Sequence, residues 1–305
     1  MSLLVIDKPV GLSSFGVVKR VRALLGKKGE KIGHGGTLDP FASGVLPICM
    51  GEGTKVLPFL LDADKTYEAE VRFGVETDTL DVTGKVVAEH PVGDLNQARV
   101  ESGLAQFRGA IEQVPPMYSA LKRDGKPLYQ YARAGLTVER APRRVTIHAL
   151  ELLGFDSPDR ARLRVRCSKG TYIRSLAADL GTALGVGAHL VGLRRTASGP
   201  FTIEQAISLD DLGQRMGAGH GLPFLPLLQA LVHLPVVEVD EPMARALGFG
   251  QHIDWNLFSG GRELLGPVAA VRDSSGVSVL VAMVAKRDDG TVKVLRGFRG
   301  DARTE

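Results

Sequence analysis

Apolar and polar residues along the chain follow two different periods. In residues 66–74 and 160–170 they alternate at every second position, which predicts half-buried β-strands. In residues 14–25 the valines and leucines recur at helical spacing, and leucines four positions apart do the same in residues 170–185. Each of these two stretches therefore predicts a helix.

The segments between these elements show no regular strand–helix–strand order. Residues 76–91 read as a hairpin, 94–108 as a helix and 189–201 as an extended piece, and the glycine-rich residues 213–223 predict a loop. We therefore expect an α+β fold with a mixed, largely antiparallel sheet flanked by helices.

The pattern changes near residue 235. One short helix is predicted at 242–250, followed by three strand-like runs with tight turns between them. Their even spacing is typical of a small β-barrel. The sequence thus predicts a first domain over residues 1–237 and a second over residues 238–305.

Composition adds a polyanion partner as a hypothesis. Of the 305 residues, 38 are Lys or Arg and 34 are Asp or Glu, giving a net charge of +4. The positive charges cluster in residues 19–31 and 122–144, and arginines occupy every second position from 160 to 166. Such clusters are typical of proteins that bind nucleic acid, although each could instead be a solvated face.

Other features indicate the cellular compartment. No apolar stretch reaches the length of a membrane span, and the N-terminus does not resemble a signal peptide. The only cysteines, Cys49 and Cys167, lie in apolar runs, so we expect buried thiols rather than a disulfide. These observations favour a cytoplasmic protein with no membrane contact.

Residues 33–47, "GHGGTLDPFASGVLP", are the clearest candidate for chemistry. Their glycines fit neither a P-loop nor a dinucleotide fingerprint, and the histidines and cysteines lack metal-ligand spacing. What remains is Asp39, followed by Pro40. An Asp-Pro pair often only starts a turn, but a carboxylate on a glycine-rich loop can also act as nucleophile or base at a sugar carbon.

Several longer motifs occur in an order that resembles a known family. They read "LLVIDKPVGLSS", "HGGTLDPFASGVLP", "DKTYEAEVRFG", "TDTLDVTG", "VPPMYSALK", "GTYIRSLAADLG" and "LRRTASGPF". Together they resemble the TruB family of tRNA pseudouridine synthases over roughly residues 3–202. The C-terminal region is similar, more weakly, to the PUA module, an RNA-binding β-barrel.

The resemblance implies a reaction and a substrate. Uridine 55 in the T-loop of tRNA becomes pseudouridine after base flipping, through an essential aspartate. The family needs no cofactor or metal, so we expect none here. We expect the T-arm of tRNA as the partner and a monomer as the active form.

The resemblance also assigns site residues. It implies Asp39 as the catalytic aspartate, Tyr67 as the tyrosine that stacks on the uracil, and Arg174 as the arginine paired with the aspartate. Without it, Tyr67 and His34 could equally be structural. The implied substrate-binding residues are His34, Tyr172 and Leu193. They also include the basic residues Lys122, Arg123 and Lys126, which lie in an RNA-clamp insertion at about residues 115–145.

Two other functions compete with this interpretation. A non-catalytic protein that binds or folds tRNA would use the same basic surfaces. A hydrolase would use Asp39 to cleave the glycosidic bond outright and release free uracil. The sequence leaves open whether Asp39 attacks C1′ or removes the 2′ proton.

Overall fold

The computed structural model describes residues 2–26, 29–157 and 159–298 of the chain. Lys27 and Lys28, which belong to the first predicted basic cluster, lie outside the described residues. So does the end of the predicted second domain, residues 299–305. No helix among the described residues is long and apolar enough to cross a membrane.

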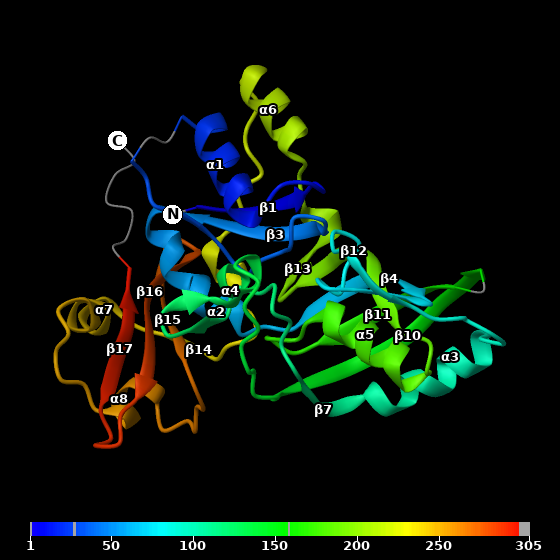
Figure 1. Cartoon of the computed structure of the whole chain (residues 1–305). Helices are drawn as coiled ribbons and strands as arrows, with labels where there is room; N and C mark the ends of the chain where they lie inside the picture. Colours follow the sequence, from blue (N-terminus) through cyan, green and yellow to red (C-terminus); the bar gives the residue numbers. More distant parts are fainter. Residues whose placement is uncertain (1, 27–28, 158, 299–305) are drawn as a thin grey trace.

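A nine-stranded sheet forms the larger part of the molecule (Figure 1). In spatial order its strands are β1 (Ser2–Lys8), β3 (Ser43–Met50), β12 (Ala188–Ser198), β4 (Lys65–Phe73), β11 (Arg160–Cys167), β10 (Arg143–Ser157) and β7 (Gly109–Gln113), with β2 (Ile32–His34) on β3 and β13 (Phe201–Thr202) on β12. All neighbours are antiparallel except β3 and β12, which are parallel. The predicted α+β class with a mixed, largely antiparallel sheet is confirmed.

Helices cover the sheet and connect its strands. They are α1 (Ser14–Leu24), α2 (Leu57–Leu61), α3 (Gln97–Leu104), α4 (Leu128–Arg133), α5 (Ile173–Ala183) and α6 (Leu209–Gly217), with 3-10 turns at Gly51–Val56, Ala105–Phe107, Ile203–Gln205 and Leu227–Leu231. The Ser13 side chain caps α1 by accepting a hydrogen bond from the Gly16 amide at 3.0 Å. Helix α5 buries Leu176 and Leu180 against the sheet. Both helices predicted from leucine and valine spacing are therefore present.

The loop predicted at residues 213–223 is wrong in its first half. Helix α6 continues to Gly217 despite the glycines, because its N-terminal end is well fixed. The Ser208 side chain accepts a hydrogen bond from the Asp211 amide, and Leu209 and Leu212 are buried. A cap and two buried leucines outweigh the roughly 1 kcal/mol helix penalty of a glycine.

The alternating arginines of β11 are not an open phosphate-binding surface. Arg164 lies opposite Glu68 of β4, and their side chains form an ion pair at 3.0 Å. Arg162 pairs with Asp156 of β10 at 2.7 Å. Cross-strand carboxylates thus pair with two of the four alternating arginines, which weakens the polyanion interpretation for this cluster for a reason that one strand alone could not show.

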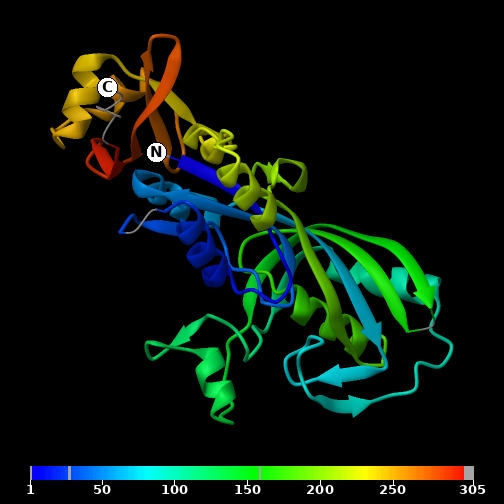
Figure 2. The ribbon, with the colours of Figure 1, turned by 90° about the horizontal axis from the view of Figure 1, so that it is seen from above.

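Two hairpins leave the main sheet. The predicted hairpin of residues 76–91 is present as β5 (Val75–Thr77) and β6 (Val86–Glu89), which pair with each other. The second hairpin, β8 (Lys122–Arg123) with β9 (Lys126–Pro127), is followed by α4. Figure 2 shows this hairpin and α4 projecting from the body of the molecule. This is the segment predicted as an insertion.

The C-terminal module is a four-stranded sheet. Its order is β14 (Val236–Glu238), β15 (Val268–Ser274), β16 (Val277–Lys286) and β17 (Val292–Gly297), and two helices accompany it, α7 (Glu241–Gly248) and α8 (Trp255–Ser259). The three long strands and α7 match the predicted runs. Among the described residues β14 and β17 do not pair with each other, so the strands form a sheet rather than the closed barrel that their spacing predicted.

This module shares a hydrophobic core with the main sheet. Val271, Leu280 and Met283 of the module pack with Leu3 and Val5 of β1 in one buried cluster. The predicted boundary at residue 237 falls inside β14, the first strand of the C-terminal sheet, and the two sheets bury apolar surface against each other. The same cluster contains Cys49, whose thiol is free, and burial raises its pKa to about 12.

We expect Met283→Ala to destabilise the whole chain rather than the module alone. Met283 is fully buried in the shared cluster, so the truncation should lower the free energy of unfolding by about 2–5 kcal/mol. Denaturant unfolding followed by circular dichroism and by tryptophan fluorescence should show one shared transition. Val277→Ala on the same strand is the control, since Val277 is 64% exposed. Two separate transitions, with only one shifted, would contradict a shared core.

Candidate active site

Asp39 lies on the loop between β2 and β3, and its neighbours fix this loop firmly. Ser14, the buried first residue of α1, accepts a hydrogen bond from the Leu38 amide at 2.8 Å and donates one to the Leu38 carbonyl at 3.1 Å. The Pro40 carbonyl accepts a hydrogen bond from the Gly11 amide at 2.7 Å. The residues on both sides of Asp39 are therefore held by the β1–α1 segment.

Arg174, in the first turn of α5, binds Asp39 directly. Its Nε lies 3.0 Å from Asp39 Oδ2, which is the ion pair that the resemblance implied. Its Nη1 donates to the Thr79 carbonyl at 3.1 Å, and its Nη2 donates to the Tyr118 carbonyl at 2.8 Å. The Arg174 side chain is 4% exposed, whereas the Asp39 side chain is 33% exposed. A fixed guanidinium thus presents a carboxylate that a ligand can reach.

A second carboxylate, Asp81, shares the same guanidinium. Its Oδ2 lies 3.4 Å from Arg174 Nη1, and its side chain is almost fully buried. Its Oδ1 accepts hydrogen bonds from Thr79 Oγ1 at 2.8 Å and from the Thr83 amide at 2.9 Å. Asp81 lies in the motif "TDTLDVTG", but the sequence alone predicted no role for it. A buried carboxylate needs such partners. Held by them, Asp81 in turn holds the Arg174 guanidinium in place.

These neighbours act on Asp39 in opposite directions. Burial raises the pKa of the Asp39 carboxyl above its usual value, and the charge of Asp81 adds to this. The Arg174 guanidinium is the main influence that lowers the pKa, and Lys8 also lowers it. An ionised Asp39 in this setting is poorly solvated and held in one orientation. Such a carboxylate is suited to nucleophilic or base chemistry.

Two tyrosines lie within electrostatic reach of Asp39. Tyr67, on β4, is buried, and burial raises the pKa of its hydroxyl; the Arg195 charge opposes this rise, and the Asp39 charge adds a smaller contribution to it. Tyr172 directly precedes α5, and burial likewise raises the pKa of its hydroxyl, with Asp39 contributing. The Gln113 side chain fixes the Tyr172 backbone by accepting from its amide at 2.7 Å and donating to its carbonyl at 3.0 Å.

Leu193 and His34 complete the predicted central set. Leu193 on β12 lies opposite Ala69 of β4, two positions from Tyr67, so these side chains share one face of the sheet. His34, on β2, is half-buried, and burial lowers its pKa, so its ring is neutral near pH 7. The structure thus brings Asp39, Arg174 and the two tyrosines together, with Leu193 on the face of Tyr67.

The three basic residues predicted for the RNA clamp lie away from the Asp39 cluster. Lys122, Arg123 and Lys126 are all exposed on the β8–β9 hairpin, outside the main sheet (Figure 2). None of them contacts the Asp39 cluster in the described residues. Arg123 instead donates to the Glu139 carbonyl within the same insertion.

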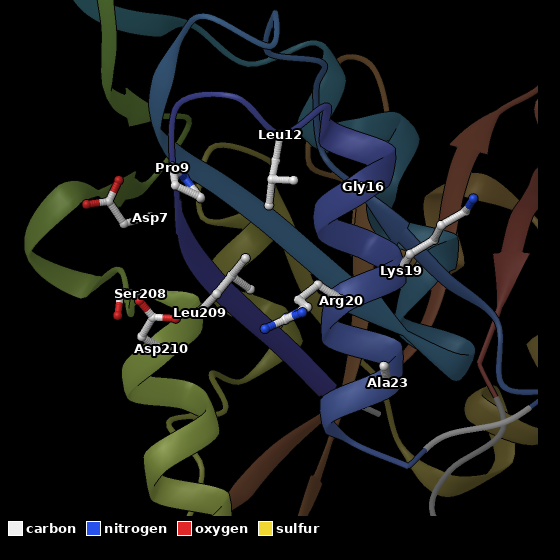
Figure 3. Close-up of a pocket in the computed structure, with 10 residues that line it drawn as sticks. All are labelled: Asp7, Pro9, Leu12, Gly16, Lys19, Arg20, Ala23, Ser208, Leu209 and Asp210. Carbon is white, nitrogen blue, oxygen red and sulfur yellow. The ribbon is translucent and has the colours of Figure 1, made fainter.

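Two hollows in the described part of the structure lie away from this cluster, and neither is lined by a predicted site residue. A groove of about 440 Å³ runs between α1 and the start of α6 (Figure 3). Arg20 points into it, and Asp210 lies on the opposite wall. Its walls carry opposite charges and include none of the predicted site residues. The Asp39 cluster is therefore identified by its ion pairs rather than by a cavity.

Comparison with known proteins supports one family. The model of the N-terminal domain of TruB family pseudouridylate synthases matches residues 22–173, and that of the tRNA pseudouridylate synthase B C-terminal domain matches residues 174–221. The tRNA pseudouridine synthase B of Azoarcus sp. (strain BH72) is 51% identical over 270 residues, which cover 86% of this chain and 89% of that protein. The protein of the same name from Burkholderia lata is 53% identical over 251 residues, covering 82% and 77%.

Two solved structures resemble nearly the whole chain. A chain of a Cbf5–Nop10–Gar1 complex is 28% identical with a TM-score of 0.74, covering 98% of this chain and 85% of the other. A chain of an H/ACA ribonucleoprotein bound to a substrate RNA containing 2′-deoxyuridine is 27% identical with a TM-score of 0.72, covering 99% and 86%. The fold is therefore that of a pseudouridine synthase.

We expect the pKa of the Asp39 carboxyl to rise when Arg174 is replaced by Gln. The guanidinium favours the ionised carboxylate, so its removal leaves burial and Asp81 opposed only by the weaker influence of Lys8. Carbon-13 NMR of aspartate-labelled protein across pH should show the Asp39 titration moving to higher pH. Arg164→Gln, which breaks an exposed ion pair with Glu68, should leave it unchanged. An unmoved titration in Arg174→Gln would show that the pair does not control Asp39.

Proposed function

The chain belongs to the TruB family of pseudouridine synthases, and on this premise we propose that it converts uridine 55 in the T-loop of tRNA after flipping that nucleotide out of the stack. That the chain is a uridine isomerase acting on tRNA follows from its family. The position and the flipping are the proposal. The observation that carries it is the Arg174 guanidinium, which holds a reachable Asp39 on one side and a buried Asp81 on the other.

Asp39 carries the chemistry in this proposal. The reaction breaks the bond between uracil N1 and ribose C1′ and joins C5 to C1′. The proton on C5 is released to water, and N1 takes up a proton in exchange. Asp39 either attacks C1′ or removes the 2′ proton, and both routes need its ionised form. Arg174 supplies this form by opposing the effect of burial. Tyr67 stacks on the uracil and helps to move the C5 proton.

Energetics favour a loop as the target. Flipping a nucleotide costs a few kcal/mol, and stacking on an aromatic side chain such as Tyr67 returns about 1–3 kcal/mol. Loop bases are already partly unstacked, so their flipping costs less than in a duplex. Leu193 and Tyr172 would enclose the base, and His34, neutral near pH 7, would help to hold it once displaced.

The exposed basic side chains of the insertion are proposed to clamp the RNA. Lys122, Arg123 and Lys126 extend from the body where they can reach phosphates, while the paired arginines of β11 contribute little. The C-terminal module, PUA-like by its strand pattern, is proposed to add affinity without taking part in the chemistry. The monomeric state and the cytoplasmic location stay predictions from the sequence.

A non-catalytic tRNA-binding or tRNA-folding protein is the second candidate. It would use the same basic surfaces, but it would gain nothing from a guanidinium buried between two carboxylates. Burying such groups carries a large desolvation cost. The Asp39 cluster therefore favours catalysis over binding alone.

Asp39→Asn should abolish turnover while tRNA binding persists. The amide keeps the shape of the side chain but cannot attack or remove a proton. Release of tritium from tRNA labelled at uracil C5 measures turnover, and filter binding measures affinity. Asp62→Asn is the control, because Asp62 is exposed and its ion pair among the described residues, with Lys169 at 2.7 Å, lies outside the Asp39 cluster. A near wild-type rate for Asp39→Asn would overturn the mechanism.

Residues 122–140 should become ordered when RNA binds. Only Leu128 in this segment is buried, so the free protein should exchange its amides there quickly, and T-arm RNA should protect them. Replacing Lys122, Arg123 and Lys126 with Ala should weaken binding. The slope of the logarithm of the binding constant against the logarithm of the salt concentration should become shallower, by up to ~0.7–0.9 per lost phosphate contact. Equal exchange with and without RNA would leave only a static surface patch.

A further inference from the structure

Arg195 of β12 is a buried arginine that none of the steps above uses. Its side chain is among the largest that are fully buried, at 1% exposure. Its Nε donates to the Val45 carbonyl at 2.8 Å, its Nη2 to the Gly36 carbonyl at 3.1 Å and its Nη1 to the Thr37 carbonyl at 3.4 Å. The Gly36 and Thr37 carbonyls lie on the loop that carries Asp39, before that residue, and the Val45 carbonyl lies on β3, directly after the loop. One guanidinium therefore connects the segment before Asp39 with the strand that follows the Asp39 loop.

The backbone of Arg195 places this guanidinium beside Tyr67. Arg195 lies directly opposite Tyr67 in the antiparallel pairing of β12 with β4, so both side chains point to the same face. On its other side β12 runs parallel to β3, where Arg195 lies beside Gly44. A Cβ at Gly44 would lie 2.2 Å from the Arg195 carbonyl oxygen, and Gly44 has φ +107°. Only glycine permits this close approach of the two strands.

The charge of Arg195 has no carboxylate partner among the described residues. Three of its hydrogen bonds go to neutral backbone carbonyls, and its side chain also hydrogen-bonds the Tyr67 hydroxyl, which is neutral as well. An arginine side chain stays charged in proteins, and burying it without a counter-ion is costly. A residue kept only to fill the core could be apolar at lower cost. An apolar side chain could not replace the directed hydrogen bonds that the planar guanidinium makes.

We propose that Arg195 is a positioning residue, which fixes the Asp39 loop against the strand that carries Tyr67. Asp39 and Tyr67 come from different parts of the chain, and Arg195 contacts the loop of one and the strand of the other. It sets the distance between the carboxylate and the stacking ring and does not touch the reacting atoms. This rests on the proposed function, in which both groups act on one nucleotide. A misplacement of about 1 Å can cost a reaction about 100-fold.

The test is Arg195→Lys beside Arg194→Lys in the full chain. Lysine keeps the charge at residue 195 but cannot span three carbonyls. Arg194 is the matched control, because it is the neighbouring residue, is 40% exposed and pairs with Asp7 at 2.8 Å. Single-turnover tritium release gives the rate, and filter binding gives the Kd for tRNA. Both are measured at a temperature where circular dichroism shows each variant folded.

We expect Arg195→Lys to lower the single-turnover rate by about 100-fold with an unchanged Kd, and Arg194→Lys to change neither. A residue that only supports the fold would lower the melting temperature and leave the rate of the folded enzyme intact. An Arg195→Lys rate near wild type would therefore overturn the proposal, as would parallel losses of rate and affinity.

A second measurement needs no variant at residue 195. In wild-type protein labelled with ¹⁵N-arginine, the Arg195 side chain should show slowed rotation of its guanidinium, because all three nitrogens are bonded. Its signals are assigned as those that persist in Arg194→Lys and Arg174→Gln and are protected from solvent. Fast rotation would overturn the proposal even if Arg195→Lys did not fold. If the wild-type enzyme released no tritium from tRNA, the proposed function would fail while this NMR result still stood.

Discussion

The site depends on one buried guanidinium, that of Arg174, held between two carboxylates. Asp39 is reachable and Asp81 is not, and both lie within ion-pair distance of the same side chain. A cation this deeply buried is stable only if its donors are used, and the Thr79 and Tyr118 carbonyls accept two further hydrogen bonds from it. The same bonds that make the burial tolerable also fix the direction in which Asp39 points.

The topology explains how these groups meet. Asp39 comes from the β2–β3 loop, Asp81 from the β5–β6 hairpin, and Arg174 from the start of α5, while Tyr67 and Arg195 face each other from β4 and β12. The central strands β3, β12 and β4 are neighbours in the sheet although they are far apart in the chain. Rigid strands thus position a site whose reactive carboxylate lies on a loop, an arrangement that favours a preorganised site.

Much of the fold was predictable from the sequence, since strong periodicity is a local signal, whereas the Asp39–Arg174 ion pair was implied by the resemblance to a known family. The alternation of β4 and β11 and the leucine spacing of α5 gave these elements directly. The helical half of residues 213–223 was missed because its cap and its two buried leucines outweigh the glycines. The neutralised arginines of β11 were missed because their partners, such as Glu68, lie on other strands. Asp81 and Arg195 were missed for the same reason, since their partners are brought close only by the fold.

The central claim is that this chain isomerises one uridine in the T-loop of tRNA without releasing the base. The most direct measurement is to incubate the wild-type protein with an unmodified tRNA transcript and map pseudouridine by carbodiimide treatment and primer extension, while assaying the same reaction for free uracil. We expect a single stop one nucleotide to the 3′ side of position 55, no free uracil and no change in the mass of the RNA. Free uracil with an abasic site, or an unmodified transcript, would contradict it.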